Sequence, residues 1–279
     1  MRDACVIVPV YQFPLTREEE ISFRCLNKVI RGRDRFIVCP KSLILPDEIV
    51  HGARVLRISD HFFNNYPYGY NRLLLRHLFY RFFSGYRFML VYQLDCLVFR
   101  DELERFVDMG FDYIGSPWFM NEALELVQAP VSVGNGGFSL RKVSTARHVL
   151  TMPMKRGTYF PKPPANVPQP RGMKWFKWNL LRRSRQHLGL WRVQDELENY
   201  FENEDVFWSF IAPKIYPSYR KAGLEAALEF SLELNPRLCV ELNGGRVPFG
   251  CHAWWKHDRE FVESMMASEF AGGGRQIRA

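Results

Sequence analysis

Apolar residues in the first third of the chain follow two alternating patterns. Short runs of strand-forming residues occupy positions 4–10 (ACVIVPV), 35–39 (RFIVC) and 55–58, as is typical of buried parallel strands. Between the first two runs, Thr16 and Glu19 have the spacing of a helix capping box. Apolar residues then recur at helical spacing, at Ile21, Cys25, Leu26 and Val29. The region therefore predicts strand–helix–strand units.

The alternation continues over the next thirty residues. Positions 70–83 (YNRLLLRHLFYRFF) predict a single helix, whose apolar side holds Leu74, Leu75, Leu78, Phe79 and Phe82. Positions 88–99 (FMLVYQLDCLVF) predict the most buried strand of the chain, with Asp95 inside it. Strands that alternate with helices predict a parallel, doubly wound α/β sheet.

The second half is less regular. Positions 112–116 predict a short strand, and positions 133–140 predict a glycine-rich turn followed by a strand. Five prolines within positions 161–170 predict an irregular loop, and positions 198–210 return to helical spacing. No repeat and no flexible linker interrupts the pattern, so residues 1–279 are expected to form a single domain with a long insertion near its middle.

Composition narrows the class of protein. The chain has 279 residues, of which 47% are hydrophobic and 24% charged, and this balance excludes fibrous, disordered and disulfide-stapled classes. It contains no run of about 18 uncharged apolar residues, the length that a membrane-spanning helix requires. Charges at Arg2 and Asp3 precede an apolar run at positions 4–10. This run is too short and too soon interrupted for a secretory signal, so none is expected. Six scattered cysteines without C-x-x-C spacing predict reduced, buried thiols and a cytoplasmic protein.

The positive charge is concentrated in one segment. Positions 126–194 contain 13 of the 38 lysines and arginines and no acidic residue, which leaves 25 basic and 30 acidic residues elsewhere. Such a segment needs an anionic partner: lipid, nucleic acid or a phosphorylated ligand. From Arg171 to Arg192 it combines seven basic residues with four Trp or Phe, which favours a helix lying on an anionic membrane surface. A lid over a bound ligand is the alternative, whereas nucleic acid is not expected because no nucleic-acid-binding motif accompanies the segment.

Asp95 stands out because its neighbours are apolar. A carboxylate at the end of a buried strand costs several kcal/mol unless it is paired or holds a metal. In open α/β sheets, ligands gather at the carboxyl ends of the strands, so a binding role is one interpretation. The other is a buried aspartate that caps the turn following it. The residues around Asp95 do not by themselves decide between the two.

Five segments together resemble one protein family. VYQLDCLVFRDEL, DYIGSPW, VGNGGFSLRKV, NEDVFW and PFGCHAWWK occur in this order. They are similar to a bacterial family, long labelled as a domain of unknown function, that is related to GT-A glycosyltransferases and associated with surface-polysaccharide and lipopolysaccharide biosynthesis. The resemblance covers roughly residues 5–256. It implies a GT-A-like (Rossmann-like) fold with a mostly parallel central sheet flanked by helices. Residues 1–115 would form the nucleotide-binding half, and residues 116–262 the acceptor half, with the basic insertion at 155–194.

The resemblance implies a metal site. GT-A enzymes hold Mn²⁺ or Mg²⁺ on the last residue of a D-x-D motif, and the matching positions here are Gln93, Leu94 and Asp95. The metal would rest on Asp95 and on His252, which sits where several such enzymes place a late histidine ligand. Gln93 can hydrogen-bond a ribose hydroxyl but brings no charge, which departs from the motif. His252 as an ordinary packed histidine is the alternative.

The glycine turn and an acidic pair have two interpretations each. Asn135, Gly136 and Gly137 could form only a tight turn with positive φ angles, or could line the donor sugar, as the resemblance implies. Glu204 and Asp205 could be ordinary charges at a helix start. By resemblance to inverting GT-A enzymes, Asp205, or Glu204 as second choice, is the general base for the acceptor hydroxyl.

Three further residues are expected to contact the donor. Tyr11 follows the first strand, where a nucleotide base could stack on it, and Asn71 and Arg72 open the predicted helix at 70–83. Each could equally be a packing or surface residue.

The leading expectation is a metal-assisted, inverting glycosyltransferase. It would move sugar from a nucleotide-diphosphate sugar, expected to be a UDP-sugar, to a glycan or lipid-linked glycan acceptor at the inner face of the cytoplasmic membrane. The alternatives are a non-catalytic nucleotide-sugar or membrane-binding module on the same fold, and a basic adaptor in which the charged segment is the whole function.

Overall fold

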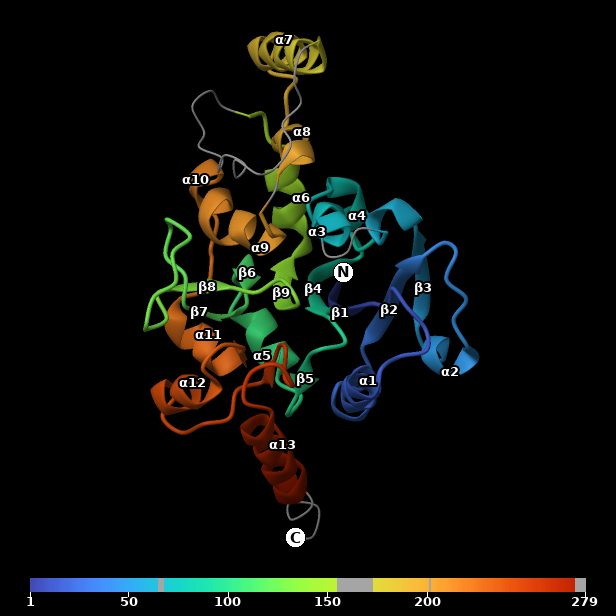
Figure 1. Cartoon of the computed structure of the whole chain (residues 1–279), viewed down its shortest axis with the longest axis vertical. Helices are drawn as coiled ribbons and strands as arrows, with labels where there is room; N and C mark the ends of the chain where they lie inside the picture. The colour runs from blue at the N-terminus through green and yellow to red at the C-terminus, as the bar shows by residue number, and fades with distance from the viewer. Residues whose placement is uncertain (65–67, 155–172, 201, 274–279) are drawn as a thin grey trace.

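A six-stranded sheet with the order β3-β2-β1-β4-β9-β6 lies at the centre of the molecule (Figure 1). The computed structural model describes residues 1–64, 68–154, 173–200 and 202–273. The strands are β1 Arg2–Pro9, β2 Asp34–Pro40, β3 Arg54–Ile58, β4 Tyr86–Tyr92, β6 Tyr113–Ile114 and β9 Phe138–Lys142. The first four run parallel, and β9 is antiparallel to both β4 and β6. The predicted α/β class with a mostly parallel sheet is confirmed.

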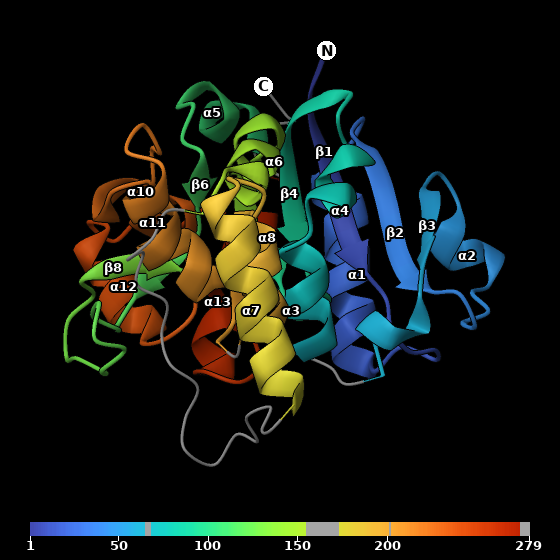
Figure 2. The ribbon, with the colours of Figure 1, turned by 90° about the horizontal axis from the view of Figure 1, so that it is seen from above.

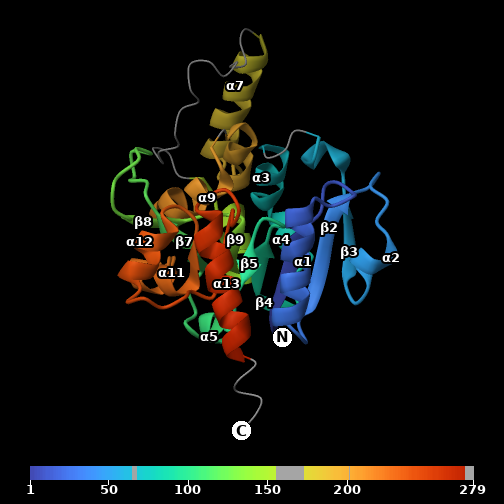
Figure 3. The same ribbon diagram turned by 60° about the horizontal axis from the view of Figure 1, so that its bottom comes forward.

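Helices cover both faces of the sheet because the strands are apolar on both sides. In β1, alternate residues enter two different cores: Ala4, Val6 and Val8 pack on the side of α1 Arg17–Val29, whereas Cys5 and Ile7 face the other way. The second core holds α3 Tyr68–Leu74, α4 His77–Arg81 and α6 Val143–Thr151. Figure 2 shows α4 and α6 in front of the strands, and Figure 3 shows α1 and α13 Arg259–Gly273 in front of them.

The remaining elements are short. Two further sheets are formed by β10 Ser231–Leu232, β11 Gly250–Cys251 and β5 Leu97–Val98, and by β7 Ser116–Trp118 with β8 Ser132–Gly134. The other helices are α2 Asp47–Val50, η1 Asp60–Phe62, α5 Leu103–Asp108, α8 Val193–Glu196, η2 Leu197–Asn199, α9 Glu204–Val206, η3 Phe207–Ile211, α10 Ala212–Ile215, α11 Leu224–Phe230 and α12 Pro236–Leu242. All six cysteines are buried and unpaired, as predicted.

The single helix predicted for positions 70–83 is wrong. The chain forms α3 and α4 instead, and Arg76 between them is extended, with φ −104° and ψ 124°. This break restarts the helical phase. Leu78 and Phe82 are therefore 53% and 57% exposed instead of facing the core.

The strand predicted for positions 88–99 is divided as well. β4 ends at Tyr92, and Asp95 lies in the turn that leads to β5. β5 leaves the central sheet because it pairs with β11. Asp95 therefore sits beyond the strand end and not inside a strand.

The helix predicted for positions 198–210 is interrupted. η2 ends at Asn199, and α9 begins at Glu204, followed by the π-helical η3. Tyr200 already has an extended backbone. The acidic pair is consequently at a helix start, as predicted, but of a much shorter helix.

Part of the basic segment from Arg171 to Arg192 forms a helix. α7 Met173–His187 projects from the body of the molecule at the top of Figure 1. The proline-rich loop at 161–170, residues 171 and 172, and the side chains of residues 173–179 lie outside the described part. Within the described ranges, every helix is too short or too polar to cross a lipid bilayer.

The capping box at the start of α1 yields a stability prediction. The Thr16 hydroxyl accepts a hydrogen bond from the Glu19 N–H at 3.2 Å, and the Glu19 carboxylate accepts one from the Thr16 N–H at 2.8 Å. We expect Thr16→Ala to lower the free energy of unfolding by about 1 kcal/mol, because an N–H of the first turn loses its partner. Thr16→Ser, which keeps the hydroxyl, is the control. Equal denaturant midpoints for the two variants would contradict the prediction.

Candidate functional site

A three-stranded sheet brings together residues that are far apart in the sequence. β10 pairs with β11 so that Leu232 faces Cys251, and β11 pairs with β5 so that Cys251 also faces Leu97. The His252 N–H donates to the Leu232 carbonyl at 2.9 Å, and the Trp254 N–H donates to the Asp95 carbonyl at 3.1 Å. This register places Asp95, Glu233 and His252 at one end of the small sheet.

Asp95 and His252 direct two polar atoms toward each other without hydrogen bonding. Asp95 Oδ1 lies 3.1 Å from His252 Nε2, and the side chains are 14% and 13% exposed. Among the described residues, neither atom has a hydrogen-bond partner. Two ligands held at right angles, each about 2.1 Å from a cation, are about 3.0 Å apart. A carboxylate oxygen and an imidazole nitrogen so placed fit Mg²⁺ or Mn²⁺.

Cys96 lies beside these atoms but does not suit the same cation. Its sulfur is within 4.8 Å of the Asp95 and His252 ligand atoms. The thiol donates to the Gly137 carbonyl at 3.3 Å, and burial raises its pKa well above the ordinary value. A neutral thiol is a poor ligand for a hard cation, so of these three groups the Asp95 carboxylate and the His252 imidazole are the ones that could hold such a cation.

The charges in this site compensate one another. Burial alone would raise the pKa of Asp95, but the His252 and Lys256 cations outweigh burial and hold that pKa below its ordinary value. Burial disfavours a charged His252, yet the carboxylates of Asp95 and Glu233 raise its pKa to about 10. Lys256 Nζ lies 2.8 Å from Asp95 Oδ2, the oxygen that faces away from the imidazole. Without a metal the site is therefore a network of paired charges, and a metal would displace the proton on Nε2.

Glycine is required at positions 136 and 137 because other side chains approach the backbone there closely. A Cβ on Gly137 would lie 2.2 Å from His252 Nε2 and 2.8 Å from Gln93 Oε1, and a Cβ on Gly136 would lie 1.9 Å from Glu204 Oε1. In the turn from Gly134 to Gly137, only Asn135 has a positive φ, of 75°. The alternative of glycines with positive φ is therefore wrong for Gly136 and Gly137. They leave room for the imidazole and the carboxylate.

Glu204 is committed to a buried ion pair. Its Oε1 lies 2.5 Å from the Arg141 guanidinium, and both side chains are almost fully buried. Arg141 also donates to the Tyr80 hydroxyl at 3.1 Å and to the Gly136 carbonyl at 3.2 Å. These contacts make Glu204 a structural carboxylate that helps to hold the glycine turn.

Asp205 is buried, and among the described residues no side-chain cation forms an ion pair with it. Its Oδ2 accepts a hydrogen bond from the Gly136 N–H at 3.1 Å. Burial, together with the charges of Glu204 and Glu233, raises the pKa of Asp205 to about 7. A carboxyl group with this pKa can take up or release a proton near neutral pH. The geometry favours Asp205 over Glu204 for proton transfer.

The other expected donor residues are placed differently from one another. Tyr11 is half-buried at the end of β1, where burial and, more weakly, the charges of Glu19 and Asp95 raise its pKa. The Asn71 amide donates to Asn203 Oδ1 at 2.8 Å and so holds the start of α9. Arg72 is exposed, and within the described residues it makes no hydrogen bond or ion pair with this site.

Three residues of the site were missed from the sequence: Arg141, Glu233 and Lys256. Arg141 and Lys256 lie inside the motifs GGFSLRK and CHAWWK, so these motifs were the usable signal. Glu233 follows a strand of only two residues, so nothing local distinguished it.

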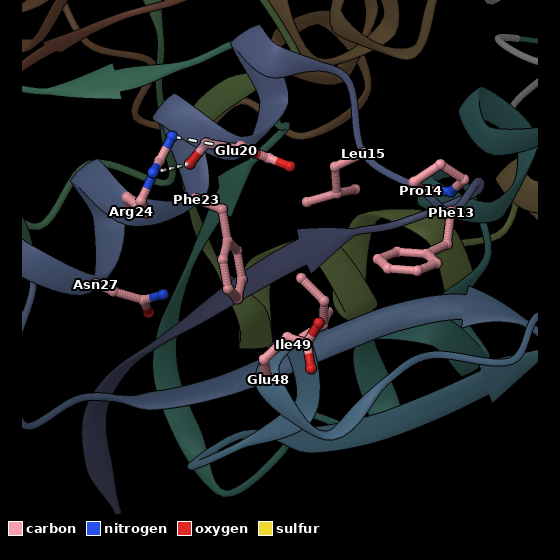
Figure 4. A pocket seen from close by; sticks show the side chains of 9 residues that line it. All are labelled: Phe13, Pro14, Leu15, Glu20, Phe23, Arg24, Asn27, Glu48 and Ile49. Atoms are coloured by element: carbon pink, nitrogen blue, oxygen red, sulfur yellow. Dashed lines mark hydrogen bonds and ion pairs between the residues drawn. The ribbon is translucent and has the colours of Figure 1, made fainter.

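A cavity lies apart from these residues (Figure 4). It has a volume of about 320 Å³ and lies between α1, α2 and the loop that follows β1. Phe13, Phe23, Leu15 and Ile49 point into it in Figure 4, with Glu20, Arg24, Asn27 and Glu48 also lining it. None of the predicted site residues lines this cavity.

Comparisons with known proteins identify one matching family and several similar solved structures. The model of the family DUF5672, described as a protein of unknown function, matches residues 52–252. No curated protein matches the sequence. Similar solved structures include apo GlyE, a glycosyltransferase of Streptococcus pneumoniae TIGR4, at 10% identity and a TM-score of 0.45. That match covers 98% of this chain and 64% of the GlyE chain, so the chain spans less than two thirds of GlyE.

Two other similar structures are matched over most of their length. The galactosyltransferase LgtC, in complex with donor and acceptor sugar analogs, has 12% identity and a TM-score of 0.46, with 94% of this chain and 95% of that chain covered. Mouse xyloside xylosyltransferase 1 has 10% identity and a TM-score of 0.46, with 90% and 97% covered.

The close approach at Gly137 yields a prediction for metal binding. We expect Gly137→Ala to weaken Mn²⁺ binding at least tenfold, because its Cβ would displace the His252 imidazole. Gly85→Ala is the control, since no atom lies within 4 Å of its Cβ. Calorimetric titration with Mn²⁺ measures both. Wild-type affinity in Gly137→Ala would show that His252 does not have to occupy this position.

Proposed function

The chain belongs to the DUF5672 family, and we propose that it is a metal-assisted glycosyltransferase of the GT-A type that uses a nucleotide-diphosphate sugar. The observation that carries the proposal is the contact between two buried ligand atoms, Asp95 Oδ1 and His252 Nε2, which lie 3.1 Å apart and have no hydrogen-bond partner among the described residues. Asp95 follows β4 and Tyr11 follows β1, and these neighbouring parallel strands are where the strand order reverses. Ligands of open α/β sheets bind at such a point.

The donor would lie across the ends of β1 and β4. Tyr11 would stack on the base, Gln93 would hydrogen-bond the ribose, and a UDP-sugar is the expected donor. Bound to Asp95 and His252, Mn²⁺ or Mg²⁺ would stabilise the negative charge of the leaving diphosphate. Lys256, 2.8 Å from Asp95 and half-exposed, could present its ammonium to the same phosphates.

The acceptor would be activated by Asp205 in an inverting reaction. Its carboxylate would take the proton of the acceptor hydroxyl as that oxygen attacks the anomeric carbon. The Gly136 N–H orients the carboxylate, and a pKa of about 7 leaves a substantial fraction ionised at neutral pH. Asn135, Gly136 and Gly137 would separate the donor sugar from the acceptor. A glycan or lipid-linked glycan of surface-polysaccharide or lipopolysaccharide synthesis is the proposed acceptor.

A screen of nucleotide-sugars with Mn²⁺ tests the proposal. We expect one donor to be hydrolysed or transferred, and Asp95→Asn to lose both Mn²⁺ binding and activity. Asp205→Asn should keep Mn²⁺ binding but reduce transfer by about 10²–10⁴-fold, because only the base is removed. The exposed Asp101→Asn serves as the control. An Asp95→Asn protein with full activity would refute the assigned site.

We also propose that the basic helix contacts an anionic membrane. Within α7, side chains are described from residue 180 onward. In this part of α7 and in the turn after it, four leucines are exposed to solvent: Leu180, Leu181, Leu188 and Leu190. Arg183 and Arg185 are exposed between these leucines. Exposed leucines and arginines on one projecting helix suit the interface of an anionic bilayer.

Vesicle co-sedimentation tests this contact. The wild-type protein should bind vesicles that contain phosphatidylglycerol and not pure phosphatidylcholine vesicles. Arg183→Glu/Arg185→Glu should lower the affinity at least tenfold, since each basic residue near such a surface contributes about 1 kcal/mol. Arg31→Glu/Arg57→Glu changes the net charge equally at other exposed positions and is the control. Equal losses in both double variants would indicate an effect of net charge alone.

A further inference from the structure

Glu233 connects the metal ligand His252 to the glycine turn. Its Oε1 lies 2.9 Å from His252 Nδ1, and its Oε2 accepts a hydrogen bond from Asn135 Nδ2 at 3.1 Å. We infer that Glu233 is a positioning residue, which orients the His252 imidazole for the metal and holds Asn135 in the turn. The inference rests on the proposed metal site and assigns a residue that the sequence motifs do not include.

Hydrogen-bond accounting sets the orientation of the imidazole. An ionised carboxylate can only accept hydrogen bonds, so the proton between Glu233 and His252 resides on Nδ1. When a bound cation displaces the second proton of the imidazole, the ring is neutral and its other nitrogen has a free lone pair. Here that nitrogen is Nε2, the atom 3.1 Å from Asp95 Oδ1. Glu233 thus selects the tautomer that can bind a cation together with Asp95, as carboxylates behind histidine ligands do elsewhere.

The second oxygen of Glu233 holds the turn that must leave room for the imidazole. Asn135 is 2% exposed and has a positive φ, and its Oδ1 accepts from the Gly137 N–H at 3.0 Å. Its amide also donates to Ser116 Oγ at 3.3 Å. The side-chain oxygen of Asn135 therefore closes the turn, and its amide nitrogen ties the turn to Glu233 and Ser116. Loss of Glu233 would release the turn and the imidazole together.

Backbone pairing places Glu233 in this position. It follows β10 directly, and the parallel pairing of β10 with β11 brings it beside His252, which follows β11. Its side chain is 19% exposed, so water competes only partly for its oxygens. Among the described residues, His252 is the cation with which Glu233 forms an ion pair.

Mn²⁺ titration calorimetry of two variants tests the inference. We expect Glu233→Ala to weaken Mn²⁺ binding 10–100-fold, the range typical of residues behind a metal ligand. Glu233→Gln should weaken Mn²⁺ binding about tenfold. Its carbonyl can still accept a hydrogen bond from Nδ1–H, but its NH2 group would face the NH2 group of Asn135, and two donors cannot bond to each other. Glu229→Ala is the matched control. Glu229 is similarly buried at 15% exposure, but it pairs with Arg105 and Arg246.

Nitrogen chemical shifts of His252 give a second readout that does not depend on activity. In the Mg²⁺-loaded wild-type protein, Nδ1 should be the protonated nitrogen, and its proton signal should be lost in Glu233→Ala. If Glu233→Ala fails to fold by circular dichroism, the near-isosteric Glu233→Gln carries the Mn²⁺ titration.

Three outcomes separate the inference from the proposed function. Weakened Mn²⁺ binding in the Glu233 variants with wild-type binding in Glu229→Ala supports the inference. Wild-type affinity and an unchanged His252 tautomer in the Glu233 variants would overturn it and leave the proposed function intact. A wild-type protein that does not bind Mn²⁺ would overturn both the metal site and the role of Glu233.

Discussion

The pairing of three two-residue strands is the constraint on which the candidate site depends. β10, β11 and β5 together supply few backbone hydrogen bonds, yet their register sets which residues follow them into the same space. Because side chains alternate between the faces of a strand, a slip of one residue would turn Asp95, Glu233 or His252 away from the others. The buried faces around Cys96, Leu97 and Cys251 oppose such a slip, since it would expose apolar side chains and bury polar ones. The strand register that buries these apolar side chains is therefore also the register that brings Asp95, Glu233 and His252 together.

Buried charge is the second feature that organises this region. Arg141 with Glu204, and His252 with Asp95 and Glu233, are ion pairs of low exposure, and removing one partner of such a pair typically costs 3–5 kcal/mol. The glycine turn lies between the two groups, and its backbone contacts both. Gly136 donates to Asp205 and accepts from Arg141, while Gly137 leaves the space that the imidazole fills. The turn thus ties the group proposed to hold metal to the group proposed to move a proton.

Local pattern predicted the elements that are regular over many residues. β1, β2, β3 and α1 lie where the apolar spacing placed them, because each strand is one uninterrupted apolar run and α1 is one uninterrupted helical repeat that begins at a capping box. The pattern failed at positions 70–83 and 88–99, where apolar residues continue through a change of backbone direction. Hydrophobicity alone does not report that change: Leu75 and Arg76 turn the chain between two helices, and Gln93 to Cys96 turn it between two sheets. Asp95 was recognised as unusual for the right reason, but its turn was not.

The sequence by itself determined the α/β class, the buried reduced cysteines, the concentration of positive charge and the candidates Asp95, His252, Asn135 and Asp205. These follow from residue type and short-range spacing, and for the site residues from motif resemblance. Only the tertiary structure decided that a carboxylate oxygen of Asp95 faces a nitrogen of His252, and that Glu233 contacts the other nitrogen of this imidazole. It also decided that Arg141 pairs with Glu204 and not with Asp205. Those pairings join residues from distant parts of the chain. Their distances are set by strand register and by close packing around glycines, neither of which is expressed in the local order of the residues.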